Sequence, residues 1–455
     1  MRGLLTLDDL RQGVLEGAID TVVVAQIDMQ GRLMGKRLQA EHFLESGWRE
    51  VHSCNYLLAT DLEMDTVPGY RETSWATGYG DHAMRPDLST LRATPWLPGT
   101  ALVLADVFDH HGHAEVPHAP RSVLRRQTAR LRERGWQALM ASELEFFLFR
   151  ESYEALQDRG YHAPTPISVY NEDYHIFQTS KEEEVIRAIR TGLYAAGVPI
   201  EGSKGEASPG QEEINIRYAE AMAAADAHAI TKNGAKEIAW GKGRALTFMA
   251  KWDDRAAGSS AHVHLSLAGL DGGSAFHDAG AEFGMSATMR AFLAGLLAHA
   301  AEITYFLAPY VNSYKRFVAG TFAPTRAVWS PDNRTAGFRL CAEGTPAVRV
   351  ECRIGGADLT PHLAYAALIA AGMAGIEAGL ELGAPFRGDA YTTPGLPEIP
   401  KTLREAALAL EGSAMLRAAL GDGVVDHYVH AARWEVAEAE RRVTSWDLAR
   451  GFERA

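Results

Sequence analysis

The sequence predicts an α+β protein made of a small N-terminal β-rich unit and a larger unit that combines a sizeable sheet with long helices. Three observations support this prediction: a β-branched run near the N-terminus, later segments in which apolar and polar residues alternate, and long Ala-rich stretches with helical periodicity. No period of 20 to 50 residues repeats along the chain, which argues against solenoids and propellers.

The chain has 455 residues and a formal net charge of −13. This charge disfavours a nucleic-acid surface. Three cysteines, Cys54, Cys341 and Cys352, form no CxxC pair, so neither a disulfide framework nor a structural zinc site is indicated. The first residues become acidic before any apolar stretch, and the apolar run 363–376 is shorter than the roughly 20 residues that span a bilayer. We therefore expect a soluble, cytoplasmic protein that binds neither nucleic acid nor membrane.

The N-terminal unit contains an expected hairpin and one further strand. The hairpin begins with Thr21–Asp28, continues through a turn at Met29-Gln-Gly-Arg, and is followed by a second apolar segment. Residues 101–107 are typical of another strand. A polar stretch at 110–120 separates this unit from a helical pattern that begins at Arg121 and runs towards Arg134.

The larger unit alternates strand-like and helical segments. Residues 137–149 predict a strand, and long helices are expected at 287–307, 363–382 and 434–452. No GxxxxGK[ST] loop and no strand-bound GxGxxG occurs, so a nucleotide would have to be held by other means.

Two pairs of carboxylates stand out in the larger unit. Glu143 and Glu145 are two residues apart in a strand-like run and therefore share one face. Neighbouring like charges destabilise a strand unless something positive neutralises them. In the second pair, Pro-Gly between Glu206 and Glu213 predicts a turn that brings these two acids together. A plain solvated face remains the alternative explanation for the first pair.

Two more alternating segments carry imidazole and guanidinium groups. The first is His262-Val-His264-Leu-Ser266, and the second is Arg349-Val-Glu351-Cys-Arg353. Carboxylates combined with imidazole suit Mg²⁺ or Mn²⁺ better than zinc. Arginines beside such ions are typical of phosphoryl transfer, because the transition state carries negative charge on its oxygens. The arginines that supply this charge are Arg316, Arg334, Arg339, Arg349 and Arg353.

Taken in order, these segments resemble the glutamine synthetase family from about residue 101 to the C-terminus. The motifs that carry the resemblance are Ser142-Glu-Leu-Glu145, Glu206 to Gly210-Gln-x-Glu213, Gly258 to His262-x-His264-x-Ser266, Asn312-Ser-Tyr-Lys-Arg316, Asn333-Arg334 to Arg339, and Arg349-x-Glu351-x-Arg353. The resemblance implies an N-terminal β-grasp domain at 1–113 and, at 114–455, a catalytic domain with a curved antiparallel sheet flanked by helices. It also implies homo-oligomeric rings such as dodecamers, with active sites shared between subunits.

The resemblance assigns a role to each of these residues. One metal ion, Mg²⁺ or Mn²⁺, would bind Glu145, Glu206 and Glu213, and a second would bind Glu143, His262 and Glu351. Glutamate would contact Gly258, Arg316 and Arg353. The transferred phosphoryl group would be neutralised by Arg334, Arg339 and Arg349. ATP would contact Glu201, Tyr218, His264 and Ser266, together with Arg339 and Arg349. The implied reaction phosphorylates the γ-carboxylate of glutamate with ATP and then lets an amine displace phosphate.

One departure from the family motif bears on the amine. Glutamine synthetases usually carry Gly-Tyr-Glu-Ala-Pro, whose Glu helps to bind ammonium and remove its proton, whereas this chain has Gly320-Thr-Phe-Ala-Pro324. The phenyl ring of Phe322 accepts no proton, but it can contact the hydrocarbon part of a larger amine or a cation through its face. The sequence therefore predicts an organic amine, either a polyamine or a monoamine, as acceptor.

The same branch is indicated by other segments. Residues 75–81, Phe322-Ala-Pro-Thr325 and the ending Val443-Thr-Ser-Trp-Asp resemble the γ-glutamylpolyamine and γ-glutamylamide synthetases. The family's Asp-Gly-Ser-Ser segment is missing, which leaves Asp61, Asp65 and Asp81 as alternatives for its acid.

Several alternatives remain open at this stage. They are a true glutamine synthetase that uses ammonia, a non-catalytic scaffold or sensor, and a ligase whose acid is not glutamate, for which Ala257 in place of the usual Asn leaves room. Tyr391 lies near the place where some bacterial members are adenylylated, but a lone exposed tyrosine is the simpler interpretation.

Overall fold

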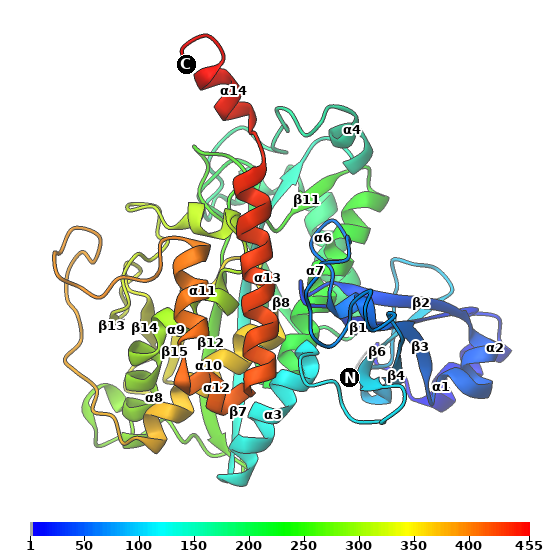
Figure 1. Cartoon of the computed structure of the whole chain (residues 1–455), viewed down its shortest axis with the longest axis horizontal. Coiled ribbons are helices and arrows are strands. Elements are labelled where there is room, and N and C mark those ends of the chain that lie inside the picture. Colours follow the sequence, from blue (N-terminus) through cyan, green and yellow to red (C-terminus); the bar gives the residue numbers. More distant parts are fainter. Residues whose placement is uncertain (1–2) are drawn as a thin grey trace.

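The computed structural model describes residues 3–455 and places two sheets side by side (Figure 1). Within these residues, the first sheet has six strands. Five of them follow the order β2-β1-β6-β4-β3, and the sixth, β5, pairs with β6. The elements of this part are α1 (Leu7–Leu15), β1 (Thr21–Ile27), β2 (Leu33–Gln39), α2 (Ala40–His42), η1 (Phe43–Gly47), β3 (Val51–Cys54), η2 (Asn55–Leu58), β4 (Asp81–Pro86), η3 (Leu88–Thr90), β5 (Arg92–Ala93) and β6 (Thr100–Asp109).

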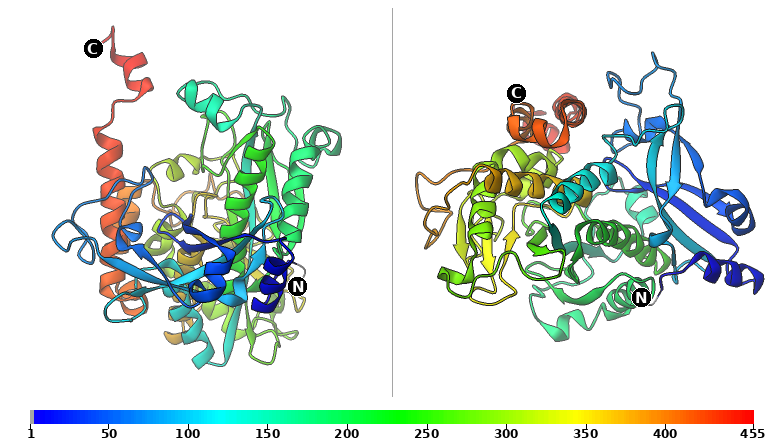
Figure 2. Two further views of the ribbon diagram at one scale, coloured as in Figure 1. Left: turned by 90° about the vertical axis from the view of Figure 1, so that its right-hand side faces the viewer. Right: turned by 90° about the horizontal axis from the view of Figure 1, so that it is seen from below.

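The expected hairpin and the strand at 101–107 are confirmed. β1 pairs antiparallel with β2 and parallel with β6, and the β-branched residues of β1 fit this central position. Figure 2 shows this part projecting to one side of the larger body.

The second sheet has nine strands within residues 3–455, in the order β13-β14-β15-β12-β7-β9-β8, with β10 and β11 also paired to β7. Its strands are β7 (Trp136–Phe149), β8 (Ile200–Gly205), β9 (Gln211–Ile216), β10 (Ala219–Glu220), β11 (Ala245–Thr247), β12 (Ala261–Gly269), β13 (Trp329–Pro331), β14 (Phe338–Cys341) and β15 (Arg349–Cys352). The pairs from β14 to β8 along this path are antiparallel, which agrees with the predicted α+β fold.

Helices pack against one face of the central strand β7. α3, α7 and α10 contact one another, and α3 and α7 also contact β7. The helices are α3 (Pro120–Glu133), α4 (Tyr153–Asp158), α5 (Ile176–Thr179), α6 (Glu183–Ala195), α7 (Ala221–Gly241), η4 (Glu282–Gly284), α8 (Ala287–Ala298), α9 (Ala300–Leu307), η5 (Asn312–Arg316), α10 (Pro361–Glu377), α11 (Leu403–Glu411), α12 (Ala414–Leu420), α13 (Asp422–Arg441) and α14 (Ser445–Gly451). None of the helices in the described residues is long and apolar enough to cross a membrane.

The three long helices expected from the sequence have different bounds in the structure. The segment 287–307 forms two helices, because the chain leaves helical geometry at His299. The helix expected at 363–382 ends at Glu377, just before Gly379 with φ +60°. The helix expected at 434–452 is also wrong as one element: α13 ends at Arg441, and α14 begins after Thr444, whose side chain caps it.

Candidate active site

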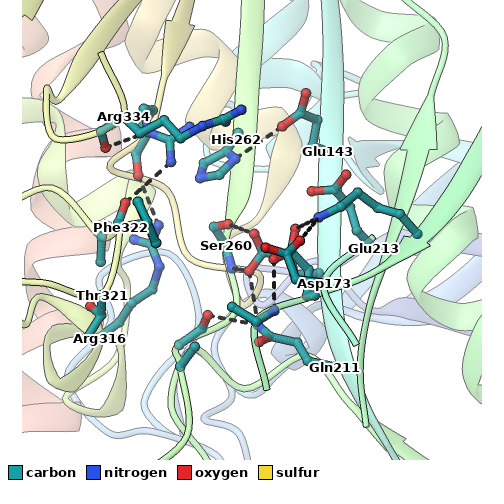
Figure 3. Close-up of a pocket in the computed structure, with 18 of the residues that line it drawn as sticks. Glu143, Asp173, Gln211, Glu213, Ser260, His262, Arg316, Thr321, Phe322 and Arg334 are labelled. Atoms are coloured by element: carbon teal, nitrogen blue, oxygen red, sulfur yellow. Dashed lines mark hydrogen bonds and ion pairs between the residues drawn. The ribbon is translucent and has the colours of Figure 1, made fainter. Parts of the chain in front are cut away.

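The strand register brings the predicted site residues together on the face of the second sheet that lies away from the helices. In β7, Ser142 and Leu144 are buried among the helices, while Glu143 and Glu145 line a cavity on the opposite side. Glu143 lies opposite His262 of β12, and Glu145 lies opposite Glu213 of β9. The expectation that alternate residues of these strands share one functional face is therefore met by the geometry (Figure 3).

The first predicted metal set forms a compact cluster. Glu145, Glu206 and Glu213 each offer an oxygen within 4.8 Å of the others. Burial and the neighbouring carboxylates raise the pKa of Glu145 to about 7 and that of Glu213 to about 8. Ser260 donates to Glu145 through both its amide, at 2.8 Å, and its hydroxyl, at 2.5 Å. Lys204 pairs with Glu206, and the strand register places it opposite Glu213.

The second predicted set lies next to the first. His262 Nδ1 is 3.2 Å from Glu143 and 3.7 Å from Glu351. His264 also reaches Glu143, at 2.9 Å. Burial raises the pKa of Glu143, but its contacts with the two imidazoles outweigh this effect and hold the pKa far below its usual range. Burial is likewise outweighed for Glu351, where the charge of Arg353 lowers the pKa to about 2.

These donors fit divalent ions that prefer oxygen. Glu145 and Glu213 favour protonation because buried carboxylates repel one another, and a divalent cation would remove that penalty. The set contains five carboxylates and one solvent-shielded imidazole, with no thiolate, which suits Mg²⁺ or Mn²⁺. The residues present therefore fit the predicted metal ions.

Arginines cover the other side of the same cavity, which has a volume of about 300 Å³. Arg339 donates to Glu351 at 2.8 Å, and Arg353 also pairs with Glu351. Arg316 is 2 % exposed and donates to the carbonyls of Ile354 and Arg353 at 3.0 Å each. Burial lowers the pKa of Arg316 to about 10, so it remains charged at neutral pH. Arg334 and Gly258 complete the predicted residues of this wall.

Phe322 lies in the wall of this cavity. It is 58 % exposed, and its backbone φ is +59°, a value that residues other than glycine seldom adopt. Its carbonyl oxygen accepts a hydrogen bond from Arg353 at 3.3 Å. The phenyl ring thus borders the same space as the predicted glutamate contacts.

The residues expected to contact ATP line a second cavity of about 610 Å³, which shares Glu143 with the first. They are Glu201, Tyr218, His264, Ser266 and Arg349, whereas Arg339 lines the first cavity. Arg349 donates through Nε to His264 Nδ1 at 3.1 Å, so the proton of His264 is on Nε2, which faces Glu143. The two cavities together are lined by every predicted metal, glutamate and ATP residue except Glu351. Glu351 lies on the same sheet face, opposite His264, but is buried beneath Arg339 and Arg353.

Several residues of the first cavity had no predicted role, among them Asp173, Lys204, Gln211 and Ser260. Ser260 directly follows the Gly258-Ser segment, and Lys204 is two residues before Glu206. Their positions next to recognised motifs could have identified both residues. Asp173 lies in a segment without periodicity, and no sequence signal would have identified it.

The N-terminal acids and Tyr391 have different surroundings. Within residues 3–455, neither cavity is lined by Asp61, Asp65 or Asp81. Asp61 instead accepts a hydrogen bond from Trp434 at 3.1 Å. Tyr391 is half-buried rather than exposed, and burial raises the pKa of its hydroxyl.

Comparisons with known proteins agree with this geometry. The family model described as "Glutamine synthetase, catalytic domain" matches residues 117–450. "Gamma-glutamylethanolamide synthetase GlnA4" of Streptomyces coelicolor is 48 % identical over 451 residues, covering 99 % of this chain and 96 % of that protein. "Glutamate--isopropylamine ligase" of a Pseudomonas species is 35 % identical over 437 residues, covering 95 % of each.

The fold has counterparts among solved structures. The structure "Apo GmaS without ligand" aligns with a TM-score of 0.85 at 26 % identity, covering 98 % of this chain and 99 % of that one. The family model spans most of the chain, and the two relatives match nearly all of it. The chain therefore belongs to the glutamine synthetase family.

Proposed function

We propose that this protein is an ATP-dependent ligase that joins the γ-carboxylate of glutamate to an organic amine. ATP would be converted to ADP and phosphate through a γ-glutamyl phosphate. The observation that carries this proposal is that Phe322 lies in the wall of the cavity formed by the carboxylates and arginines. In the glutamine synthetase motif that this segment resembles, the corresponding position is a Glu.

The two acidic sets supply the metal sites. Glu145, Glu206 and Glu213 would hold one Mg²⁺ or Mn²⁺ ion, and Glu143, His262 and Glu351 would hold another. When bound, such ions neutralise the oxygens of the nucleotide phosphates.

The arginines would position the two reacting groups. Arg316 would bind the α-carboxylate of glutamate, and Gly258 leaves space beside it: a Cβ built at this glycine would lie 2.5 Å from Arg316 Cγ. Arg353 would face the γ-carboxylate, whose oxygen attacks the terminal phosphorus of ATP while ADP leaves. Arg334 and Arg339 would stabilise the negative charge of the transferred phosphoryl group.

Nucleotide would occupy the second cavity. Ser266 and Glu201 line it, and the ring of Tyr218 at its rim is 58 % exposed, which leaves a face free to stack on a base. Arg349 and His264, joined by a hydrogen bond, would lie beside the phosphates.

The amine would enter beside Phe322. Its nitrogen would attack the acyl phosphate carbon, the carbon–nitrogen bond would form, phosphate would leave and the nitrogen would lose a proton. The phenyl ring offers apolar contact to carbon atoms of the amine but no negative charge for ammonium. The relatives named for ethanolamide synthesis and isopropylamine ligation favour a small monoamine within this class.

Phosphate release with ATP, Mg²⁺ and glutamate tests the proposal. Ammonium, ethanolamine, isopropylamine, putrescine and spermidine are compared at equal concentrations, and the product is identified by mass. A response to one of the organic amines with ammonium near background is expected. Turnover with ammonium alone would mean that the protein is a glutamine synthetase with a rebuilt ammonium site.

We further propose that residues 1–113 and 114–455 are separate domains and that subunits assemble into rings with shared active sites. The C-terminal helix α14 supports assembly, because it extends away from the body and has no buried residue (Figure 1). Its Trp446 and the following Phe452 are 61 % and 85 % exposed. Light scattering should give a mass of many subunits, and a variant that ends at residue 442 should form smaller assemblies. A full-length monomer that turns over normally would refute the shared site.

A further inference from the structure

A second cluster of acids lies behind the catalytic face. Glu212 belongs to β9, and because successive strand residues point to opposite faces, its side chain points away from that of Glu213. It meets Glu172, from the segment before α5, and Glu182, which immediately precedes α6. An oxygen of each of these three carboxylates lies within 4.8 Å of the others.

Unpaired oxygens distinguish this cluster from a solvated acidic patch. Glu172, Glu182 and Glu212 are 0 %, 3 % and 1 % exposed. Each has one buried carboxylate oxygen without a hydrogen-bond partner in the described part of the chain, namely Oε2 of Glu172 and Oε1 of Glu182 and of Glu212. A buried carboxylate left unpaired is costly, so three that converge call for a positive charge between them.

Within residues 3–455, no lysine or arginine forms an ion pair with any of these three carboxylates. Glu172 accepts hydrogen bonds from the amide of Gly210, at 2.5 Å, and from the hydroxyl of Ser168, both of which are neutral donors. The nearby Arg190 directs its two terminal nitrogens to Glu183, at 2.5 and 2.9 Å, and to Ser203, at 2.9 Å. The charge of Arg190 also acts on Glu212, but its ion pair is with Glu183.

The spacing suits a divalent ion that prefers oxygen. Ca²⁺ binds oxygens at about 2.3 to 2.6 Å, so ligand oxygens on opposite sides of one ion lie about 5 Å apart. The three glutamate oxygens, which lie within 4.8 Å of one another, fit within that span. Three glutamates that bind through one or two oxygens each supply three to six ligand atoms, and waters or carbonyls complete such shells.

We propose that Glu172, Glu182 and Glu212 form a structural site for a divalent cation, Mn²⁺ or Ca²⁺, separate from the catalytic metal sites. The ion would tie together three segments that are distant in sequence: the loop before α5, the start of α6 and the strand β9. This inference does not depend on the proposed reaction.

The location gives the site a role in shaping the catalytic cavity. Asp173 and Tyr174 follow Glu172 directly, and both line that cavity. Lys204 joins Asp173, at 3.1 Å, to the predicted metal ligand Glu206. The loop also packs tightly against β8, since a Cβ built at Gly205 would lie 2.6 Å from the carbonyl oxygen of Glu172. A cation at Glu172 would hold this wall in place.

Protons are the competing occupants of the cluster. Burial, together with the adjacent Glu172, raises the pKa of Glu182 to about 10, so that a proton would remain there if no cation were bound. The two possibilities differ in the number of metal ions bound and in the response to neutralising substitutions.

Crystals of the full-length protein grown with Mn²⁺ provide the direct test. Anomalous scattering should show a peak among the three glutamates in addition to peaks at the catalytic carboxylates. Peaks at the catalytic site alone would overturn the inference while leaving the proposed function intact. A peak only at the cluster would support the inference and contradict the catalytic metal assignment, and the lack of peaks at both places would overturn both.

A matched pair of variants provides the test in solution. Glu182→Gln removes one ligand, and Glu183→Gln changes the neighbouring residue, which pairs with Arg190 outside the cluster. Equilibrium dialysis should show one Mn²⁺ per subunit fewer for Glu182→Gln than for the wild type, and no loss for Glu183→Gln. The Mn²⁺-induced increase in Tm should also shrink only in Glu182→Gln. If the cluster merely shares protons, Glu182→Gln will keep the full Mn²⁺ count and gain stability without metal, which would overturn the inference.

Discussion

Ser260 is expected to set the metal affinity of the catalytic site through Glu145. Its hydroxyl donates to one oxygen of that carboxylate at 2.5 Å, and its amide donates to the other at 2.8 Å. Ser260→Ala removes the first hydrogen bond, keeps the second and changes the side-chain volume little. The substitution therefore tests one contact of a predicted metal ligand.

The size of the effect follows from the charge and burial of that contact. A hydrogen bond to a charged group contributes about 1.5 to 3 kcal/mol. Its loss also raises the pKa of Glu145 further, because the hydroxyl stabilises the ionised form. Groups that orient metal ligands typically change metal affinity by about 10- to 100-fold when removed. We expect the half-saturating concentration of Mn²⁺ to rise by about that factor.

The neighbouring Ser259 provides the control. It is fully buried, and its hydroxyl has no hydrogen-bond partner among the described residues, so Ser259→Ala should change the Mn²⁺ requirement by less than about twofold. Phosphate release is measured against Mn²⁺ concentration for the wild type and both variants, with thermal melts to verify folding. Equal Mn²⁺ dependence of Ser260→Ala and the wild type would refute the assignment of Glu145 as a metal ligand.

Three other changes test separate parts of the structure. Phe322→Glu should lower kcat/KM for the organic amine at least about tenfold and raise turnover with ammonium. The uncharged control Phe322→Gln should lower kcat/KM for the organic amine without raising turnover with ammonium. An unchanged amine preference in both variants would exclude Phe322 from the amine site. The half-saturating Mn²⁺ concentration should rise as the pH falls from about 8.5 to about 6.5, because protons compete with the metal for Glu145 and Glu213, whose pKa values lie at about 7 and about 8. A half-saturating Mn²⁺ concentration that does not change with pH would contradict the assignment of these two residues as metal ligands. Gly372→Ala should lower the free energy of unfolding by about 1 to 3 kcal/mol, because its Cβ would lie 2.1 Å from the ring of Phe292. The control Gly423→Ala, whose Cβ would meet nothing within 4 Å, should leave the free energy of unfolding unchanged or raise it. Equal Tm values for Gly372→Ala and the wild type would mean that α10 can shift away from α8.

The strands of the active face were predictable because their chemistry follows a period of two. Glu143 and Glu145 share a face by that rule alone, and pairing with β9 and β12 then places Glu213 and His262 opposite them. The pairing partners were not predictable from local pattern, since strand order depends on contacts between distant segments. The resemblance to a known family supplied that order.

Helix ends were less predictable than helix positions. The segment 287–307 is mostly apolar and contains no proline or internal stop signal strong enough to mark His299 as a break. The boundary after Arg441 depends on Thr444, which caps the next helix together with Asp447. That capping pair is visible in the sequence, but the helical pattern on both sides of it outweighed the signal.

The cluster of Glu172, Glu182 and Glu212 could not be predicted from local sequence patterns. Glu212 precedes Glu213 in a motif that was recognised, yet only the residue on the catalytic face received a role. Its partners Glu172 and Glu182 lie in irregular chain or at a helix start, where no periodicity indicates which way a side chain points. Only the fold brings these three acids together.

Arg353 contacts both Phe322, the proposed amine contact, and Glu351, a predicted metal ligand. Its guanidinium pairs with Glu351 and also donates to the carbonyls of Arg334, at 3.2 Å, and of Phe322, at 3.3 Å. The left-handed conformation of Phe322 costs about 1 to 3 kcal/mol and must be offset by contacts such as this one. A ligand that draws Arg353 towards a phosphorylated carboxylate would therefore also shift the position of the phenyl ring. Because the guanidinium proposed to face glutamate also contacts Phe322, we expect the shape of the proposed amine site to depend on whether glutamate has been activated.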